Sequence, residues 1–324
     1  MTRKKIFTGI ILFIFAVTVT VALTGCTATT GDNGGKISVV ATVFPEYDWV
    51  KNIIGNNTEN ANVTLLIDNG VDLHSYQASA DDIIKISKCD VFIYSGGESD
   101  RWVNDALKEA TNKNMRVVNL LEILGERAKE EETVEGMQTE KDGGDKEYDE
   151  HVWLSLKNTV IFAEAIRTAL CEVDSENAGL YNKNTDEYIK KLNELDEQYQ
   201  KAVDTAKTKT VLFADRFPFR YMTDDYGLKY YAAFAGCSAE SEASFETVAF
   251  LARKVDELNL SSIITLDGSD CKIAETVAKT ADKKDVRILS MDSMQSVTAD
   301  DVKNGATYLS IMENNLETLQ TAMQ

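Results

Sequence analysis

Short runs of β-branched and aromatic residues alternate with longer stretches of helical periodicity over residues 37–324. In the first half of the chain, these runs predict strands at residues 38–43, 62–67, 90–94 and 116–120. In the second half, they predict strands at residues 210–214, 229–234, 261–266 and 286–290. Alternation of strands with helices is typical of parallel sheets covered by helices. We therefore expect an α/β fold of two lobes, each with a mainly parallel sheet flanked by helices.

Helices are expected between these strands. Ser79 followed by Asp81 and Asp82 is typical of a helix N-cap with acidic residues in the first turn. In the second half, helical periodicity predicts helices at residues 217–225, 244–259, 272–283 and 301–323. Another helix is expected at residues 157–172, just before the longest periodic stretch of the chain.

That longest stretch covers residues 175–207. Its apolar side chains recur at steps of three and four, at Leu180, Tyr181, Tyr188, Ile189, Leu192, Leu195, Tyr199 and Val203. A helix of this length spans roughly 45 Å, enough to connect two lobes. We assign residues 37–174 to an N-terminal lobe and residues 208–324 to a C-terminal lobe. Because a long helix resists bending, we expect only small closure motions.

Residues 126–150 interrupt the pattern. They include Glu130, Glu131 and Glu132 in succession, a Gly143-Gly144 pair and almost no apolar periodicity. This composition predicts a mobile, solvated acidic loop. This segment is either an acidic linker without a function of its own or a segment that helps to gather metal ions, and the sequence leaves both interpretations open.

The first 25 residues are typical of a bacterial export signal. Three basic residues stand within the first five positions, and an apolar stretch runs from Ile6 to Val21. The sequence Leu-Thr-Gly-Cys that follows ends at Cys26 and has the form of a lipobox. We predict that residues 1–25 are removed, that Cys26 is lipidated and that residues 26–36 form a flexible tether. A transmembrane anchor with a chance cysteine is the alternative.

The chain has 53 acidic and 34 basic residues, a formal net charge of −19. Such a charge repels nucleic acid and anionic lipid headgroups and concentrates cations near the surface. Nucleic-acid binding is therefore excluded. The charge is compatible with a cationic ligand, although solubility alone also explains it.

Four cysteines follow Cys26, at Cys89, Cys171, Cys237 and Cys271. None of them forms a C-x-x-C spacing, so we do not expect a structural zinc site built on cysteines. Disulfides and buried reduced thiols both remain open.

The chain contains only two histidines, His74 and His151. His74 lies just beyond a predicted strand, where open α/β sheets bind their ligands. His151 stands at the point where ordered sequence resumes after the acidic segment. A lone histidine is more often structural, but these two positions make both residues candidate metal ligands.

Several motifs resemble the metal-binding lipoproteins of ABC-type zinc and manganese importers, a family also described as adhesins. The segments that carry the resemblance are Val40–Asp48, Leu73–Tyr76, Asp90–Gly97, His151–Leu154 and Asp225–Leu228. The resemblance implies an extracytoplasmic, membrane-anchored binding protein that delivers its metal to an ABC permease. It also implies that His74 and His151 are ligands, and we expect a monomer.

The same resemblance implies a third and a fourth ligand in the second lobe. The fourth position fits Asp267, at the end of a predicted strand. The third falls on Arg216, which cannot donate a lone pair to a metal. A guanidinium about 4 to 5 Å from a divalent ion would cost roughly 7 to 8 kcal/mol at an effective dielectric constant near 20. Arg216 must therefore turn away from the metal, pair with an acid or mark a changed site. Asp215, next to it in the sequence, is the candidate that would replace it as a ligand. Alternatively, Asp215 is the N-cap of the helix that follows.

Two imidazoles and two carboxylates suit Zn²⁺, and Mn²⁺ is the second choice. The affinity should fall below about pH 6.5, because imidazoles bind metal only when they are unprotonated. Glu242, Asp270 and Cys271 are further candidates near the cleft.

An enzyme is not expected. The chain lacks H-E-x-x-H, G-x-S-x-G and P-loop motifs. The remaining alternative is a surface adhesin of this fold whose metal site is altered or lost.

Overall fold

A computed structural model describes residues 36–57, 59–138, 147–238 and 242–324. Residues 36–324 form one compact unit. The predicted export signal, Cys26 and most of the tether lie outside the described residues, as do residues 139–146 of the acidic segment. No helix in the described parts combines the length and apolar character that crossing a membrane requires.

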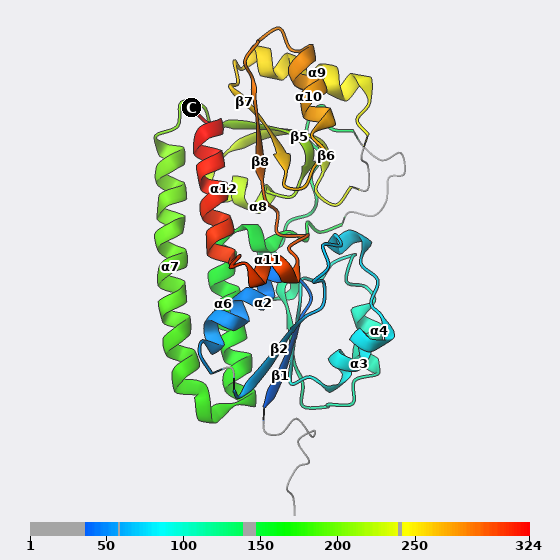
Figure 1. Cartoon of the computed structure of the whole chain (residues 1–324), viewed down its shortest axis with the longest axis vertical. Coiled ribbons are helices and arrows are strands. Elements are labelled where there is room, and N and C mark those ends of the chain that lie inside the picture. Colours follow the sequence, from blue (N-terminus) through cyan, green and yellow to red (C-terminus); the bar gives the residue numbers. More distant parts are fainter. Residues whose placement is uncertain (1–35, 58, 139–146, 239–241) are drawn as a thin grey trace, which may run out of the picture. The chain divides into compact units, whose positions relative to one another are not determined.

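Two four-stranded sheets form the two lobes, which confirms the predicted fold class (Figure 1). The first sheet has the order β2-β1-β3-β4 and contains β1 (Ile37–Ala41), β2 (Ala61–Leu65), β3 (Val91–Tyr94) and β4 (Arg116–Asn119). The second has the order β6-β5-β7-β8 and contains β5 (Thr210–Phe217), β6 (Lys229–Ala235), β7 (Ser262–Leu266) and β8 (Arg287–Met291). Neighbouring strands are parallel in both sheets. The loops that follow the strands therefore lie at one edge of each sheet, where proteins of this class usually bind their ligands.

The helices of the N-terminal lobe are α2 (Phe44–Ile54), α3 (Ala80–Lys88), α4 (Val103–Lys108) and α5 (Leu120–Leu124), with the short 3₁₀ turns η1 (Leu73–Ser75), η2 (Gly125–Arg127) and η3 (Val152–Leu154). Two of these helices, α3 and α5, begin at polar caps, Ser79 and Asn119. Ser79 caps α3 as predicted, because its hydroxyl accepts the Asp82 N–H at 3.2 Å. Glu46 in the first turn of α2 is fully buried and accepts the backbone N–H groups of Thr42 and Val43.

The C-terminal lobe contains α8 (Arg220–Tyr226), α9 (Phe245–Glu257), α10 (Lys272–Thr280), α11 (Ala299–Lys303) and α12 (Tyr308–Ala322). Two sequence predictions need correction here. The single helix expected at residues 301–323 is two helices, because the chain turns at Gly305 with φ +98°. The helix expected from residue 217 begins at Arg220, since β5 continues to Phe217.

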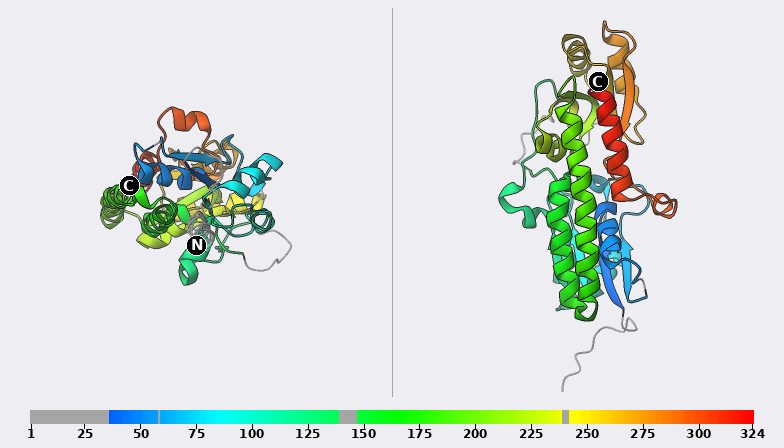
Figure 2. Two further views of the ribbon diagram at one scale, coloured as in Figure 1. Left: turned by 90° about the horizontal axis from the view of Figure 1, so that it is seen from below. Right: turned by 90° about the vertical axis from the view of Figure 1, so that its left-hand side faces the viewer.

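Three long helices pack side by side and connect the lobes (Figures 1 and 2). After α6 (Leu156–Val173) and the turn η4 (Ser175–Asn177), the long helix α7 (Ala178–Asp204) has 27 residues and spans about 40 Å. The terminal helix α12 packs on α7, on β8 and on α2. Tyr308 at its start donates a hydrogen bond to the Trp153 carbonyl at 2.7 Å. The start of α12 thus packs against the N-terminal lobe, while its end at Met323 accepts the backbone N–H groups of Lys207 and Thr208 just before β5.

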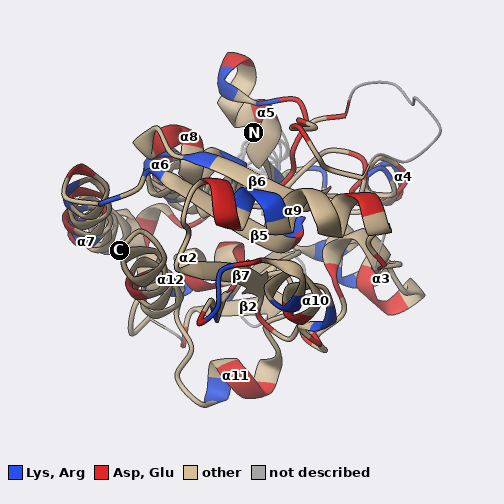
Figure 3. Cartoon of the chain, turned by 90° about the horizontal axis from the view of Figure 1, so that it is seen from above, with Lys and Arg blue, Asp and Glu red and all other residues tan. Residues whose placement is uncertain are grey.

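Acidic and basic residues are mixed on elements such as α9 and α11 (Figure 3). The described part of the acidic segment contacts the C-terminal lobe. Its two arms pair in an antiparallel bridge between Glu130 and Tyr148. The Lys129 N–H donates to the Tyr221 hydroxyl at 2.8 Å, and Met137 is buried. This part of the segment is therefore packed against protein, while its predicted mobility stays a prediction.

Candidate metal centre

The two histidines of the chain meet, although 77 positions separate them. His74 is the middle residue of η1 in the loop after β2, where Asp72 caps the turn by accepting the His74 N–H at 3.0 Å. His151 directly precedes η3 and is fully buried. Their Nε2 atoms lie 3.2 Å apart. A tetrahedral ion with metal–nitrogen distances of about 2.0–2.1 Å would hold two ring nitrogens about 3.3 Å apart, so this spacing fits one ion between them.

A buried carboxylate orients His151. Asp149 Oδ1 lies 2.8 Å from His151 Nδ1 and also accepts the His151 backbone N–H at 2.9 Å. We assign the ring proton to Nδ1 from this contact, which leaves the Nε2 lone pair available to a metal. Asp149 is itself held, because its N–H donates to the Lys129 carbonyl at 2.8 Å.

His74 is oriented by a hydroxyl and a second buried carboxylate. Its Nδ1 lies 2.8 Å from Ser99 Oγ and 3.6 Å from Glu150 Oε2. Glu150 Oε1 accepts the Ser99 N–H at 2.7 Å. Gly97 allows this arrangement, since its φ is +87° and an added Cβ would lie 2.5 Å from Glu150 Oε1. Two carboxylates thus stand behind the two imidazoles.

Burial keeps His74 neutral. Desolvation, and then the neighbouring His151, lower the pKa of His74 to about 3. For this residue, protonation therefore does not compete with metal binding near pH 6.5. The sequence predicted that metal affinity falls below about pH 6.5, and this pH is too high for His74.

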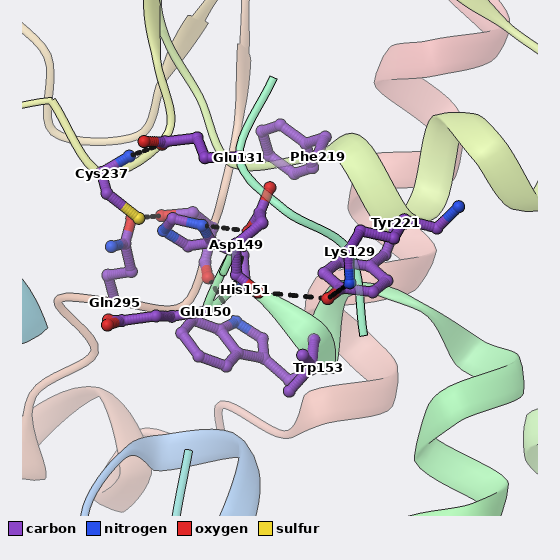
Figure 4. A network of polar contacts seen from close by, with 12 residues as sticks. Lys129, Glu131, Asp149, Glu150, His151, Trp153, Phe219, Tyr221, Cys237 and Gln295 are labelled. Atoms are coloured by element: carbon purple, nitrogen blue, oxygen red, sulfur yellow. Dashed lines mark hydrogen bonds and ion pairs between the residues drawn. The ribbon is translucent and has the colours of Figure 1, made fainter. Parts of the chain in front are cut away.

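The loop after β6 brings a third donor to the histidines. The Sγ of Cys237 and one ring nitrogen of each histidine all lie within 4.8 Å of one another. Gly236 lets the backbone approach, because a Cβ there would lie 3.0 Å from His151 Cε1. The Cys237 N–H donates to Glu131 Oε1 at 2.6 Å (Figure 4). Burial, with nearby carboxylates, raises the pKa of the Cys237 thiol well above its usual value.

Arg216 pairs with an acid, one of the three outcomes expected for it. Its Nη2 lies 2.7 Å from Asp72 Oδ2, and this ion pair joins the two lobes across 144 positions of sequence. The Arg216 charge still acts on His74, where it contributes to the lowered pKa.

The two carboxylates predicted in the second lobe are placed differently. Asp215 is half-buried, and its two oxygens accept the backbone N–H groups of Arg216 and Leu266. Asp267 follows β7, is exposed and accepts a long hydrogen bond from Ser290. Neither belongs to the donor group of His74, His151 and Cys237 within the described residues. Their assignment as ligands stays a prediction.

A cavity of about 410 Å³ opens beside His74. Residues of both lobes line it, among them Asp72, His74, Asp215, Arg216 and Asp270. Asp215 thus shares a cavity with His74, whereas Asp267 is not part of its lining. Glu242 and Cys271, the other weighed candidates, do not line it either.

Sequence reasoning missed the residues that orient the two histidines. Asp149 stands two positions before His151, a spacing that is typical of a local turn and was a usable signal. Cys237 was considered only as a disulfide partner or a buried thiol. In the structure Cys89, Cys171, Cys237 and Cys271 are all free thiols. No local pattern connects Cys237 with Glu131, 106 positions earlier.

The chain is similar to known zinc-binding and zinc-uptake proteins. The model of the family "zinc-uptake complex component A, periplasmic" matches residues 39–322. The chain is 31% identical over 291 residues to the zinc-binding lipoprotein AdcA of Streptococcus pneumoniae (strain ATCC BAA-255 / R6), with 88% of this chain and 56% of that protein covered. It thus spans only about half the length of this relative.

Another relative is matched over nearly its whole length. The chain is 29% identical over 306 residues to the high-affinity zinc uptake system protein ZnuA of Bacillus subtilis (strain 168), with 94% and 93% covered. The crystal structure of the Zn(II)-bound ZnuA-like domain of Streptococcus pneumoniae AdcA superposes with a TM-score of 0.70 at 30% identity. That superposition covers 89% of this chain and 99% of the domain.

Proposed function

The chain belongs to the family of periplasmic zinc-uptake complex components A, and from this premise we propose that it captures Zn²⁺ and delivers it to an ABC-type permease. The observation that carries the proposal is the convergence of His74 and His151, whose Nε2 atoms lie 3.2 Å apart. Each ring is oriented through its Nδ1, by Asp149 and by Ser99. Such outer partners are typical of histidines that bind metal.

The electrostatics of the site favour a dication. Asp149 and Glu150 are buried directly behind the imidazoles, which stabilises a positive charge placed between the rings. Imidazole ligands suit Zn²⁺, while Mn²⁺ is the second candidate because it favours oxygen. A site closed by protein ligands has no open position for an activated water. The proposed function is therefore binding, without a catalytic step.

We assign the remaining oxygen donor to the C-terminal lobe. Asp215 is the better placed of the two predicted carboxylates, because it lines the cavity that His74 also lines. Each of its oxygens accepts one backbone N–H and retains a second lone pair for a metal. Asp267 is the alternative donor at the neighbouring strand end.

The first residues support a location at the cell membrane. We propose that lipidated Cys26 anchors a monomeric body on the extracytoplasmic face of the cell membrane. A tethered binding protein keeps its cargo close to the permease, since a short linker maintains a high effective concentration.

Thermal unfolding tests metal capture directly. A ligand that binds only the folded state stabilises it by about 2.7 kcal/mol at one hundred times its Kd. We expect Zn²⁺ to raise the melting temperature of the wild type and to have no effect on the double variant His74→Ala/His151→Ala. If neither Zn²⁺ nor Mn²⁺ stabilises the wild type, metal capture is wrong and the adhesin alternative gains support.

A further inference from the structure

We infer that Cys237 supplies a thiolate ligand to the captured ion, and that this ligand makes the site select Zn²⁺ over Mn²⁺. The inference rests on the proposed function, because it adds a ligand to the site of His74 and His151. It assigns a function to the acidic segment as well, since Glu131 holds the backbone of Cys237.

The three donor atoms have the spacing of a small ion's first shell. The sulfur and the two ring nitrogens lie within 4.8 Å of one another. Around a tetrahedral zinc, with Zn–S near 2.3 Å and Zn–N near 2.0–2.1 Å, sulfur and nitrogen are about 3.5 Å apart. Only a small adjustment of the loop is therefore needed. Figure 4 shows the Cys237 side chain directed toward the imidazole of His151.

Cys237 differs in its surroundings from the other described cysteines. Cys89 and Cys171 direct their thiols to backbone carbonyls of Ile86 and Ala178. Cys271 contacts Thr265 and Ser269 near the end of β7. Among the described cysteines, Cys237 alone joins the two histidines. Cys271 is half-buried in the same lobe and serves as a matched control.

One paired segment positions two of the ligands. Its arms are joined by hydrogen bonds from Glu131 N–H to the Glu147 carbonyl at 2.7 Å and from Asp149 N–H to the Lys129 carbonyl at 2.8 Å. On one arm, Glu131 accepts the Cys237 N–H. On the other arm, Asp149 orients His151. The acidic segment thus fixes Cys237 and His151 relative to each other, and Glu131 is a positioning residue.

The thiolate also explains how the site tolerates Arg216. The position that should supply the third ligand holds a guanidinium, which Asp72 binds. When the metal binds, it displaces the proton of the Cys237 thiol to solvent, and the resulting thiolate adds both a donor atom and a negative charge. Thiolates favour Zn²⁺, whereas Mn²⁺ prefers oxygen ligands. A thiolate from Cys237, in place of the ligand missing at position 216, therefore favours Zn²⁺ over Mn²⁺.

Cobalt substitution of the full chain tests the inference by absorption, independently of transport. We expect Co²⁺ to give a thiolate-to-metal charge-transfer band in the near ultraviolet. The band should disappear in Cys237→Ser and persist in the control Cys271→Ser. We also expect Cys237→Ser to weaken Zn²⁺ binding at least about tenfold and to leave Mn²⁺ binding nearly unchanged.

Glu131 is tested by a pair of variants. Glu131→Ala should reduce the band and weaken Zn²⁺ binding by roughly tenfold, as loss of an outer partner does. Glu131→Gln keeps an oxygen acceptor for the Cys237 N–H and should retain most of both.

The outcomes separate the inference from the proposed function. If wild-type protein binds Co²⁺ through His74 without the charge-transfer band, the thiolate assignment is wrong and metal capture stands. If it binds no metal at all, both fail. The wild-type spectrum decides this even if Cys237→Ser does not fold.

Discussion

The two lobes bring different kinds of donor to the proposed metal centre. In the N-terminal lobe, His74 is nearly buried and His151 is fully buried. Each ring is held by a polar partner. In the C-terminal lobe, Asp267 is exposed and Asp215 is engaged with backbone N–H groups. Arg216, which stands where a ligand was expected, is bound to Asp72 of the opposite lobe.

This difference indicates that one half of the site is built before the metal arrives. A preorganised imidazole pair loses little conformational freedom on binding, whereas donors that are exposed or engaged in other contacts must be ordered first. The N-terminal lobe should therefore supply most of the affinity. The C-terminal lobe should adjust the affinity and select the metal.

The largest expected effect is the loss of either imidazole. His74→Ala and His151→Ala should each weaken Zn²⁺ binding by more than about 100-fold, or about 2.7 kcal/mol, because no other described residue replaces the lost donor. Isothermal titration calorimetry at pH 7.5 measures this change. An affinity within a few-fold of wild type would contradict the assignment of the N-terminal lobe as the main half-site.

The second prediction concerns the buried carboxyl group of Glu46 and the effect of burial on its pKa. Desolvation raises the pKa of Glu46 to about 7, against backbone hydrogen bonds that lower it. The pKa of Glu46 is higher in the folded state than in the unfolded state, so the protonated side chain adds to the free energy of unfolding. This contribution is fully present below about pH 4.5 and is lost as the pH rises through 7.

Glu46→Gln should remove this pH dependence. Between pH 5 and pH 8, the stability of the variant relative to wild type should rise by about 1–3 kcal/mol. Urea unfolding at both pH values measures it, with exposed Glu59→Gln as the control. Equal changes in both variants would show that Glu46 titrates like a surface acid.

The carboxylates of the C-terminal lobe come next. Asp215→Asn should weaken Zn²⁺ binding about tenfold, because a donor that shares the cavity with His74 loses its charge. Asp267→Asn, at an exposed position, should have a smaller effect. A larger loss for Asp267 in the same titration would reverse the preference for Asp215.

The smallest expected effect concerns the ion pair between the lobes. Asp72→Asn leaves the Arg216 charge without its partner near the bound cation, so Zn²⁺ affinity should fall about fivefold. Arg216→Met should not lower it, and the double variant should regain most of the loss. If Asp72→Asn has no effect even at low ionic strength, Arg216 is too far away or too well screened to influence the metal.

The fold was largely predictable because its signals are local. Each of the eight strands lies within a few residues of its predicted position, and the 27-residue α7 lies inside the predicted long helix. The errors lie at element ends. Gly305 divides the last helix at a left-handed backbone angle that periodicity does not reveal.

The candidate site was predictable only in part. His74 and His151 were found because they are the two histidines of the chain and lie at strand and segment ends. Asp149 was within reach of local reasoning, while Cys237 and Glu131 were not. Their hydrogen bond joins two loops whose sequences have no shared pattern.

The sequence by itself determined the two parallel sheets, the long connecting helix, the family and two candidate imidazole donors. Periodicity, caps and motifs depend on residues close to one another in the chain, so they can be read from it directly. Only the tertiary structure decided which side chains meet: Arg216 with Asp72, Glu131 with Cys237, and Cys237 with both histidines. Such contacts depend on how the two lobes and the acidic segment pack together, and that packing is set by the whole chain.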